Sequence, residues 1–169
     1  VVAYQTAWLK AYYPVEFMAA LMTSVMDNTA KVTGYINDCR RMGIEILPPD
    51  INESFVQFSV SDGKIRFSLA AIKSVGRPFI KAIEKEREKN GKFKGLTDFC
   101  ERMSGKDNNR RMVESLIYAG AFDSFGGTRR QYVTVCKSVM DGLSQSRKNN
   151  IEGQLNLFDI CAEDNGSVT

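Results

Sequence analysis

Leu69-Ala-Ala-Ile-Lys-Ser-Val-Gly-Arg-Pro-Phe-Ile-Lys-Ala-Ile83 is the stretch that decides the fold. Its apolar residues recur at helical spacing on both sides of Ser74-Val75-Gly76, and Gly76 permits a tight turn. Pro78 suits the opening turn of a helix, because proline lacks only an N–H group that has no helical partner there. The stretch therefore predicts two helices joined by a short turn, which is a helix-hairpin-helix unit.

Such a hairpin can bind DNA through backbone amides at the start of its second helix, where they point at a phosphate. Lys73, Arg77 and Lys81 surround this turn, and each would add a contact that releases counterions from DNA. The alternative is a tight corner between two helices whose lysines are only solvated. The predicted phosphate site comprises Lys73, Ser74, Val75, Gly76, Arg77 and Lys81.

A second, looser pair of helices follows. We expect helices over residues 96–103 and 109–118, then a turn over 119–123, then a last helix from the capping Thr128 to about residue 147. Four arginines flank this turn near two helix starts, where the helix dipole favours acids, so they indicate an external anion. Solvated surface arginines are the alternative. The arginines are Arg110, Arg111, Arg129 and Arg130, and the expected core stripe of the last helix is Tyr132, Val133, Val135, Cys136, Val139, Met140 and Leu143.

The N-terminal part, residues 4–42, is predicted to form three helices. Pro14 opens the second, Asn28 or Thr29 caps the third, and Gly43 ends it. We expect the aromatic and methionine side chains of this part to be core. Residues 44–47 then form a short extended piece before a linker. Two alternating runs around Asp62-Gly63 predict a β-hairpin over residues 55–69, with its Phe58 and Phe67 side packed on helices. The expected fold class is mainly α: a helical bundle with tandem helix-hairpin-helix and one short β-hairpin.

Composition argues against catalysis by this chain alone. It has 169 residues, a net charge of +3 and no histidine, which removes histidine bases, triads and histidine metal sites. It has no D-x-D pair for magnesium and no phosphate-binding P-loop. Glu84, Glu86 and Glu88 alternate with basic residues, so we expect ion pairs on a solvated helix face. We expect neither a membrane span nor a signal peptide. The four scattered cysteines, Cys39, Cys100, Cys136 and Cys161, are expected to be free core thiols of a reducing cytosol.

Near the end of the sequence, Gln154-Leu155-Asn156-Leu157-Phe158 lies between two strongly polar stretches. An apolar pocket on a partner would bury Leu157 and Phe158, at roughly 1.5–3 kcal/mol per side chain. Gln154 could form hydrogen bonds at the rim, and Leu155 would make a shallower contact. The pentapeptide therefore indicates a docking motif, and the alternative is a C-terminal segment folded back on its own domain.

Several of these pieces, in this order, closely resemble the bacterial replicative DNA polymerase III alpha subunits, the C-family polymerases. The pentapeptide resembles the motif by which bacterial replication proteins hold the sliding clamp, Gln-Leu-Ser/Asp-Leu-Phe. The hairpin of the family reads Gly-Val-Gly, and Ser74 replaces the first glycine, so Ser74 is strained if that position needs a positive φ. The resembling pieces are residues 4–10, 13–24, 39–52, 69–76, 93–100, 109–123 and 154–158.

The resemblance implies a piece of a longer polymerase, as does a start at Val1-Val2-Ala3 without an initiator Met. Residues 1–51 would end the fingers, 52–150 would form the tandem helix-hairpin-helix domain, and 151–169 would be a tail with the clamp motif. Implied partners are duplex DNA (primer–template), the sliding clamp (beta subunit) and other polymerase III holoenzyme subunits, in the bacterial cytoplasm. Magnesium would be bound by palm aspartates of the parent, with no cofactor in this chain. The alternative is a stand-alone DNA-binding adaptor with a clamp tether, and a palm with paired aspartates upstream would distinguish the polymerase from it.

Overall fold

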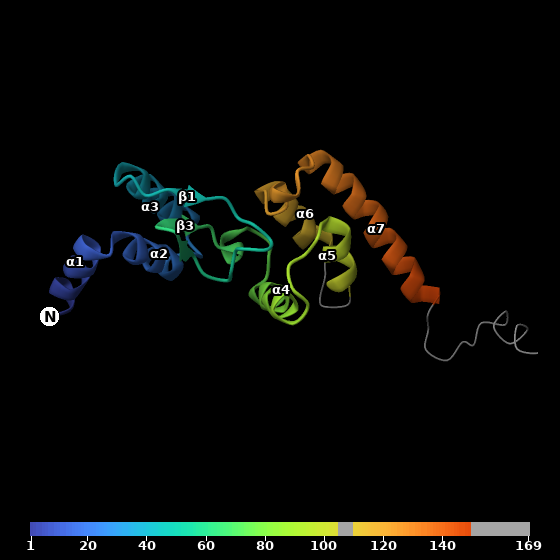
Figure 1. Ribbon diagram of the computed structural model, residues 1–169, viewed down its shortest axis with the longest axis horizontal. Helices are drawn as coiled ribbons and strands as arrows, with labels where there is room; N and C mark the ends of the chain where they lie inside the picture. The colour runs from blue at the N-terminus through green and yellow to red at the C-terminus, as the bar shows by residue number, and fades with distance from the viewer. Residues whose placement is uncertain (105–109, 150–169) are drawn as a thin grey trace, which may run out of the picture.

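The computed structural model describes residues 1–104 and 110–149, with side chains described as far as Gly142 (Figure 1). Helices dominate, and one small sheet lies among them, so the predicted mainly α fold class is confirmed. The elements in chain order are α1 (Val2–Tyr12), α2 (Pro14–Ser24), α3 (Thr29–Arg41), β1 (Ile46–Leu47), β2 (Ser59–Ser61), β3 (Lys64–Arg66), a 3₁₀ helix (Leu69–Ala71), α4 (Arg77–Asn90), α5 (Leu96–Arg102), α6 (Arg110–Ala119), a second 3₁₀ helix (Asp123–Phe125) and α7 (Arg129–Asn149).

Local signals set the limits of the first three helices as predicted. Pro14 occupies the first turn of α2. Asn28 caps α3, since its side-chain oxygen accepts a hydrogen bond of 3.1 Å from the backbone N–H of Lys31. Gly43, with a φ of 73°, follows α3 in the left-handed conformation that stops a helix.

The sheet has the strand order β1-β3-β2. Asp62 and Gly63 connect β2 to antiparallel β3 with φ values of 51° and 73°, the two positive angles that the tight hairpin turn requires. The Phe58 and Phe67 rings meet edge-to-face at 5.1 Å between centroids, and the backbone N–H of Phe58 donates to Thr23 Oγ1 on α2. The predicted hairpin and its packing on a helix are thus confirmed. The extended piece before it, however, joins the sheet, because β1 pairs in parallel with β3.

Two hydrophobic clusters hold the described residues together. The first cluster is N-terminal and includes Phe58 and Ile65, whereas the second, formed mainly by α4 to α7, includes Ile51. The chain therefore passes between the two clusters near the sheet. In the second cluster, the Phe99 ring has three aromatic neighbours, Phe79, Phe93 and Phe122, at 5.0–6.3 Å. The first cluster is built on Met18, Ala19, Met22, Val32, Cys39, Ile44, Phe58 and Ile65, and the second on α4, α5, α6 and the start of α7.

The expected aromatic core of the N-terminal part is wrong for α1, in which no residue is buried. Figure 1 shows α1 at the end of the molecule, beyond α2. Trp8 is 42% exposed and contacts the rings of Tyr12 and Tyr13, which are exposed themselves. Periodicity predicts that a helix has an apolar face, but it does not say whether the same chain supplies the surface that covers it.

The last helix, α7, starts with a reciprocal cap. The backbone N–H of Thr128 donates to Gln131 Oε1 (2.9 Å), and the N–H of Gln131 donates to Thr128 Oγ1 (3.3 Å), which confirms the predicted cap. Five members of the predicted core stripe are buried or half-buried against the second cluster: Tyr132, Val133, Cys136, Val139 and Met140. Val135 is 40% exposed, so its assignment to the core was wrong, and the Leu143 side chain lies outside the described part.

Candidate nucleic-acid interface

The turn of the first predicted helix-hairpin-helix unit, residues 74–76, lies directly before α4. Ile72, with φ −78° and ψ 124°, ends the preceding 3₁₀ helix, so the first element of the hairpin is one short turn where a longer helix was expected. Gly76 is the N-cap of α4 in an extended conformation, and the first turn of α4 contains no acidic residue. The first N–H groups of a helix have no carbonyl partner within it, and the helix dipole makes this end positive. The positive end of α4 is therefore not neutralised by an acid of its own first turn.

Ser74 has a φ of 68°, so the first position of the turn does require the left-handed region. For a residue with a Cβ this conformation costs roughly 1–2 kcal/mol, and the surrounding packing must hold it. Val75 supplies that packing, because its side chain is buried in the second cluster. The backbone N–H of Val75 donates to Ile72 O (3.3 Å), so this amide is engaged inside the turn.

The cations of the first hairpin differ in their partners. Arg77 pairs with Asp27, with Nη2 3.2 Å from each carboxylate oxygen. Lys73 and Lys81 are exposed, and neither takes part in any ion pair recorded within residues 1–104 and 110–142. Lys81 lines a shallow groove beside Phe58 and Glu84. The two lysines therefore present their charge to solvent, whereas the charge of Arg77 is paired with the carboxylate of Asp27.

Two of the four arginines near the second turn pair with acids of this chain, whereas the sequence predicted that they face an external anion. Arg129 pairs with Asp123 (Nη2–Oδ2 2.6 Å), and its Nη1 donates to the carbonyl of Tyr118 (2.9 Å). This hydrogen bond with Asp123 raises the pKa of Arg129. Arg110 pairs with Glu114 (2.9 Å) along α6, and the Glu114 carboxylate likewise raises the pKa of Arg110. These two arginines brace the turn and the helix.

The two remaining predicted arginines, Arg111 and Arg130, have exposed side chains, Arg111 on α6 and Arg130 on α7. Arg130 lies beside Thr128 and Val135 in a shallow surface groove. The two hairpin turns pack on one core, because Ile72 and Val75 of the first and Ala121 and Phe122 of the second all belong to the second hydrophobic cluster. The structure therefore places both predicted DNA-contacting turns on the same body.

Glu84 and Glu86 connect α4 to neighbouring segments of the chain, which contradicts their expected place on a solvated helix face. Glu84 Oε1 accepts a hydrogen bond from the backbone N–H of Val56 (2.8 Å). Glu86 is only 6% exposed and pairs with Arg102 of α5 (3.1 Å), while Asn90 donates to the same carboxylate (2.6 Å). No signal near Glu86 in the sequence could reveal this pair, because Arg102 lies in the next helix.

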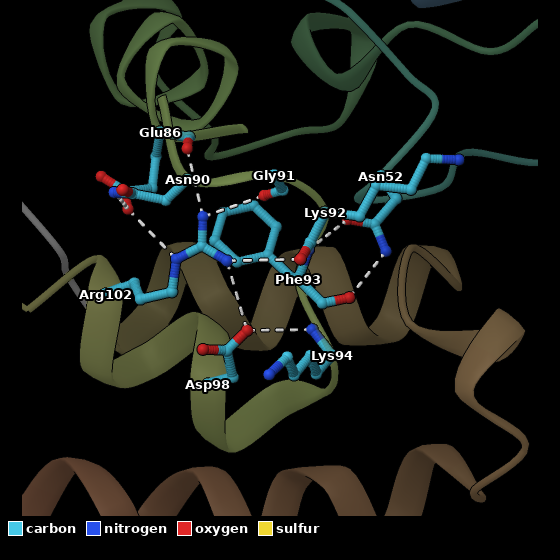
Figure 2. Close-up of polar contacts among 9 residues, drawn as sticks. All are labelled: Asn52, Glu86, Asn90, Gly91, Lys92, Phe93, Lys94, Asp98 and Arg102. Carbon is cyan, nitrogen blue, oxygen red and sulfur yellow. Dashed lines mark hydrogen bonds and ion pairs between the residues drawn. The ribbon is translucent and has the colours of Figure 1, made fainter. Parts of the chain in front are cut away.

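Arg102 is the centre of a polar cluster that fixes the link between α4 and α5 (Figure 2). Its guanidinium also contacts Asp98 Oδ2 (3.3 Å) and donates to the backbone carbonyls of Glu86 (3.1 Å), Gly91 (3.0 Å) and Lys92 (3.4 Å). It lies 4.3 Å from the ring centroid of Phe93. The Asn52 side chain holds Phe93 from the other side, accepting from its N–H (2.8 Å) and donating to its carbonyl (2.9 Å). These contacts set the position of α5 against α4.

Three cysteines are free and buried, as predicted: Cys39, Cys100 and Cys136. Burial, mainly, raises the pKa of the Cys39 thiol, and a hydrogen bond with Cys136 together with burial raises that of Cys100. Among the described residues, no three side chains of His, Cys, Asp or Glu gather as metal ligands, and no helix is long and apolar enough to cross a membrane. Cys161 and the predicted docking motif, Gln154 to Phe158, lie outside the described residues.

Comparison with known proteins agrees with the geometry of the hairpins. Residues 43–132 match the family model described as the helix-hairpin-helix motif, and the chain belongs to this family. The match covers both turns described above and the core between them.

Relatives that match almost the whole of this chain make the resemblance specific. The chain is 46% identical over 164 residues to the DNA polymerase III subunit alpha of Escherichia coli (strain K12), and 47% identical over 163 residues to that of Neisseria meningitidis serogroup B. It is 46% identical over 154 residues to that of Deinococcus radiodurans. These matches cover 96%, 96% and 91% of this chain but only 14%, 14% and 12% of the relatives. The resemblance to polymerase III alpha subunits is confirmed, and the chain spans about one seventh of their length.

Proposed function

We propose that this chain is part of the alpha subunit of a bacterial replicative DNA polymerase, in which it binds duplex DNA and connects the enzyme to its sliding clamp. The observation that carries the proposal is the 46% identity to a DNA polymerase III subunit alpha over 96% of the chain. Template-directed synthesis, with its palm aspartates and magnesium, is assigned to the rest of the subunit, and so are the contacts with other holoenzyme subunits. The proposal places the enzyme in the bacterial cytoplasm and keeps the domain limits of 1–51, 52–150 and 151–169.

Duplex DNA would lie across the two turns and contact the protein through phosphates. The start of α4 supplies a positive helix end, and Lys73 and Lys81 supply exposed cations beside it. Such contacts position a duplex without reading its bases, so binding is independent of sequence and weakens with salt. Arg130 and Arg111, near the second turn, would extend the same contact along the backbone.

The DNA contact is tested with the variant Lys73→Ala/Lys81→Ala on a short labelled duplex at several salt concentrations. Each lost phosphate contact reduces the slope of log affinity against log salt by about 0.9, so the double variant loses up to about 1.8. Lys10→Ala/Lys31→Ala, two exposed lysines on α1 and α3, is the matched control and keeps the slope of the original chain. Equal slopes for the two double variants would refute the hairpin as the DNA site.

The clamp contact is assigned to Gln154, Leu155, Leu157 and Phe158, with the last two as anchors in an apolar pocket. Removing a buried anchor from an interface typically costs 2 kcal/mol or more. Leu157→Ala/Phe158→Ala is therefore expected to abolish clamp binding measured by surface plasmon resonance, with an unchanged melting temperature. Ile151→Ala/Ile160→Ala, which truncates apolar residues on either side of the motif, is the control and keeps binding. A lower melting temperature with intact clamp binding would instead favour the folded-back alternative.

Catalysis is assigned to the rest of the polymerase, so the purified chain is expected to incorporate no nucleotide on a primed template with magnesium. The reason is chemical: phosphoryl transfer of this kind uses carboxylates that hold metal ions, and this sequence has no D-x-D pair. Template-dependent extension that survives repurification would overturn this division of labour.

A further inference from the structure

Asp27 lies in the turn between α2 and α3, yet its carboxylate faces the start of α4. Arg77 Nη2 is 3.2 Å from both of its oxygens, and this contact links residues 50 positions apart in the sequence. Both side chains are open to solvent, 89% for Asp27 and 55% for Arg77. The acid thus neutralises a cation of the predicted phosphate site, on the helix end that otherwise carries positive charge alone.

We propose that Asp27 competes with DNA phosphate for Arg77 and thereby limits the affinity of the first hairpin for duplex DNA. This inference rests on the proposed DNA-binding function. Arg77 donates to Asp27 through Nη2 alone, so this nitrogen and the charge that it carries are shared between the carboxylate and any phosphate that approaches. An exposed ion pair is weak enough to exchange its acid for another anion. Asp27 is therefore an affinity-determining residue of the site, although it is not a DNA ligand.

The competition has a consequence for salt dependence. Where a cation binds phosphate without an internal partner, it displaces counterions from DNA. When Arg77 leaves Asp27 for phosphate, the freed carboxylate attracts a cation again, which offsets part of that release. Lys73 and Lys81, which have no recorded acidic partner among the described residues, carry no such offset. Arg77 thus contributes less to the salt slope than either lysine.

The test compares Asp27→Asn, Arg77→Gln and the double variant in binding a short labelled duplex at several salt concentrations. Asparagine keeps the shape of Asp27 and removes its charge. We expect Asp27→Asn to bind about twofold to fivefold more tightly at low salt, the range that an exposed ion pair can withhold. Its salt slope should steepen by up to about 0.9. In the Arg77→Gln background, Asp27→Asn should change neither quantity.

Asp38→Asn is the matched control, because Asp38 is a half-exposed acid of α3 whose recorded ion pair is with Arg41 of the same helix. It removes the same net charge and is expected to leave affinity unchanged. The inference is overturned if Asp27→Asn binds no more tightly, if the gain persists without Arg77, or if Asp38→Asn gives an equal gain. If binding depends on Lys73 and Lys81 while Asp27→Asn has no effect, the inference alone fails. If the original chain and all variants leave duplex DNA unbound, the proposed function fails with it.

Discussion

Replacing Arg102 by methionine tests whether the polar cluster between α4 and α5 holds the second core together. Methionine keeps the unbranched stem and removes the guanidinium, so the change takes away the ion pair that Arg102 forms with the buried Glu86 carboxylate. Five contacts disappear at once: the two carboxylates and three backbone carbonyls that the guanidinium reaches.

The expected loss is large because the pair is shielded from water. The side chains of Arg102 and Glu86 are 18% and 7% exposed, and breaking a buried pair by removing one partner typically costs about 3–5 kcal/mol. An exposed pair costs about 0–1 kcal/mol. Asn90 still donates to Glu86 in the variant, and the Asp98 contact is the more open of the two, so we expect about 3 kcal/mol.

Urea unfolding followed by far-UV circular dichroism measures this loss, with a lower midpoint at an unchanged m value. Arg41→Met is the matched control, because Arg41 pairs with Asp38 on the surface and its loss is expected to cost less than about 1 kcal/mol. Glu86→Gln completes a double-mutant cycle. In the absence of the Glu86 charge, Arg102→Met should cost about 1–3 kcal/mol less than it does alone.

Two results would refute the reasoning. One is a loss for Arg102→Met no larger than that for Arg41→Met, since the burial of the pair would then have no energetic weight. The other is additivity of Arg102→Met and Glu86→Gln within about 0.5 kcal/mol, the range found for residues that do not interact.

Three further substitutions test single backbone positions by thermal unfolding. Ser74→Gly should stabilise the fold by about 0.5–1 kcal/mol, because relief of a φ of 68° exceeds the entropy that glycine adds to the unfolded chain; a lower melting temperature would contradict this. Gly120→Ala should destabilise by about 1–2 kcal/mol, since Gly120 has a φ of 90° and an added Cβ would lie 2.5 Å from Arg129 Nη2; an unchanged melting temperature would contradict it. Gly142→Ala, on α7 with open space around it, should stabilise by up to about 1 kcal/mol and would count against the helix there if it did not.

Those parts of the fold that depend on neighbouring residues could be predicted from the sequence. Pro14, Asn28 and Gly43 act on the turn in which they stand, and each limits a helix as expected. Asp62-Gly63 likewise determines the hairpin through its own φ angles. The helical pattern of residues 69–73 was less reliable, because only one 3₁₀ turn forms before Ile72 becomes extended. In so short a run, packing decides between an α-helix and a single 3₁₀ turn.

Features that depend on distant residues could not be predicted. Glu86 alternates with basic residues, and this pattern is typical of a solvated face, but its partner is supplied by α5, sixteen positions later. Trp8 and its aromatic neighbours on α1 have the composition of a core, yet no described element covers them. In both cases the local pattern correctly predicts a helix, but it does not predict which other part of the protein packs against that helix.

The same limitation decides how far the DNA site could be read from the sequence. The sequence locates a basic side chain beside a predicted turn. The capacity of that side chain to bind phosphate depends on whether it already forms an ion pair with an acid of the same chain. Arg77, Arg110 and Arg129 have such partners in Asp27, Glu114 and Asp123, respectively. Lys73, Lys81 and Arg130 have no acid recorded within the described residues, so they can release counterions without first breaking an ion pair. The affinity of the two helix-hairpin-helix turns for duplex DNA should therefore depend more on these three residues than on Arg77, Arg110 and Arg129.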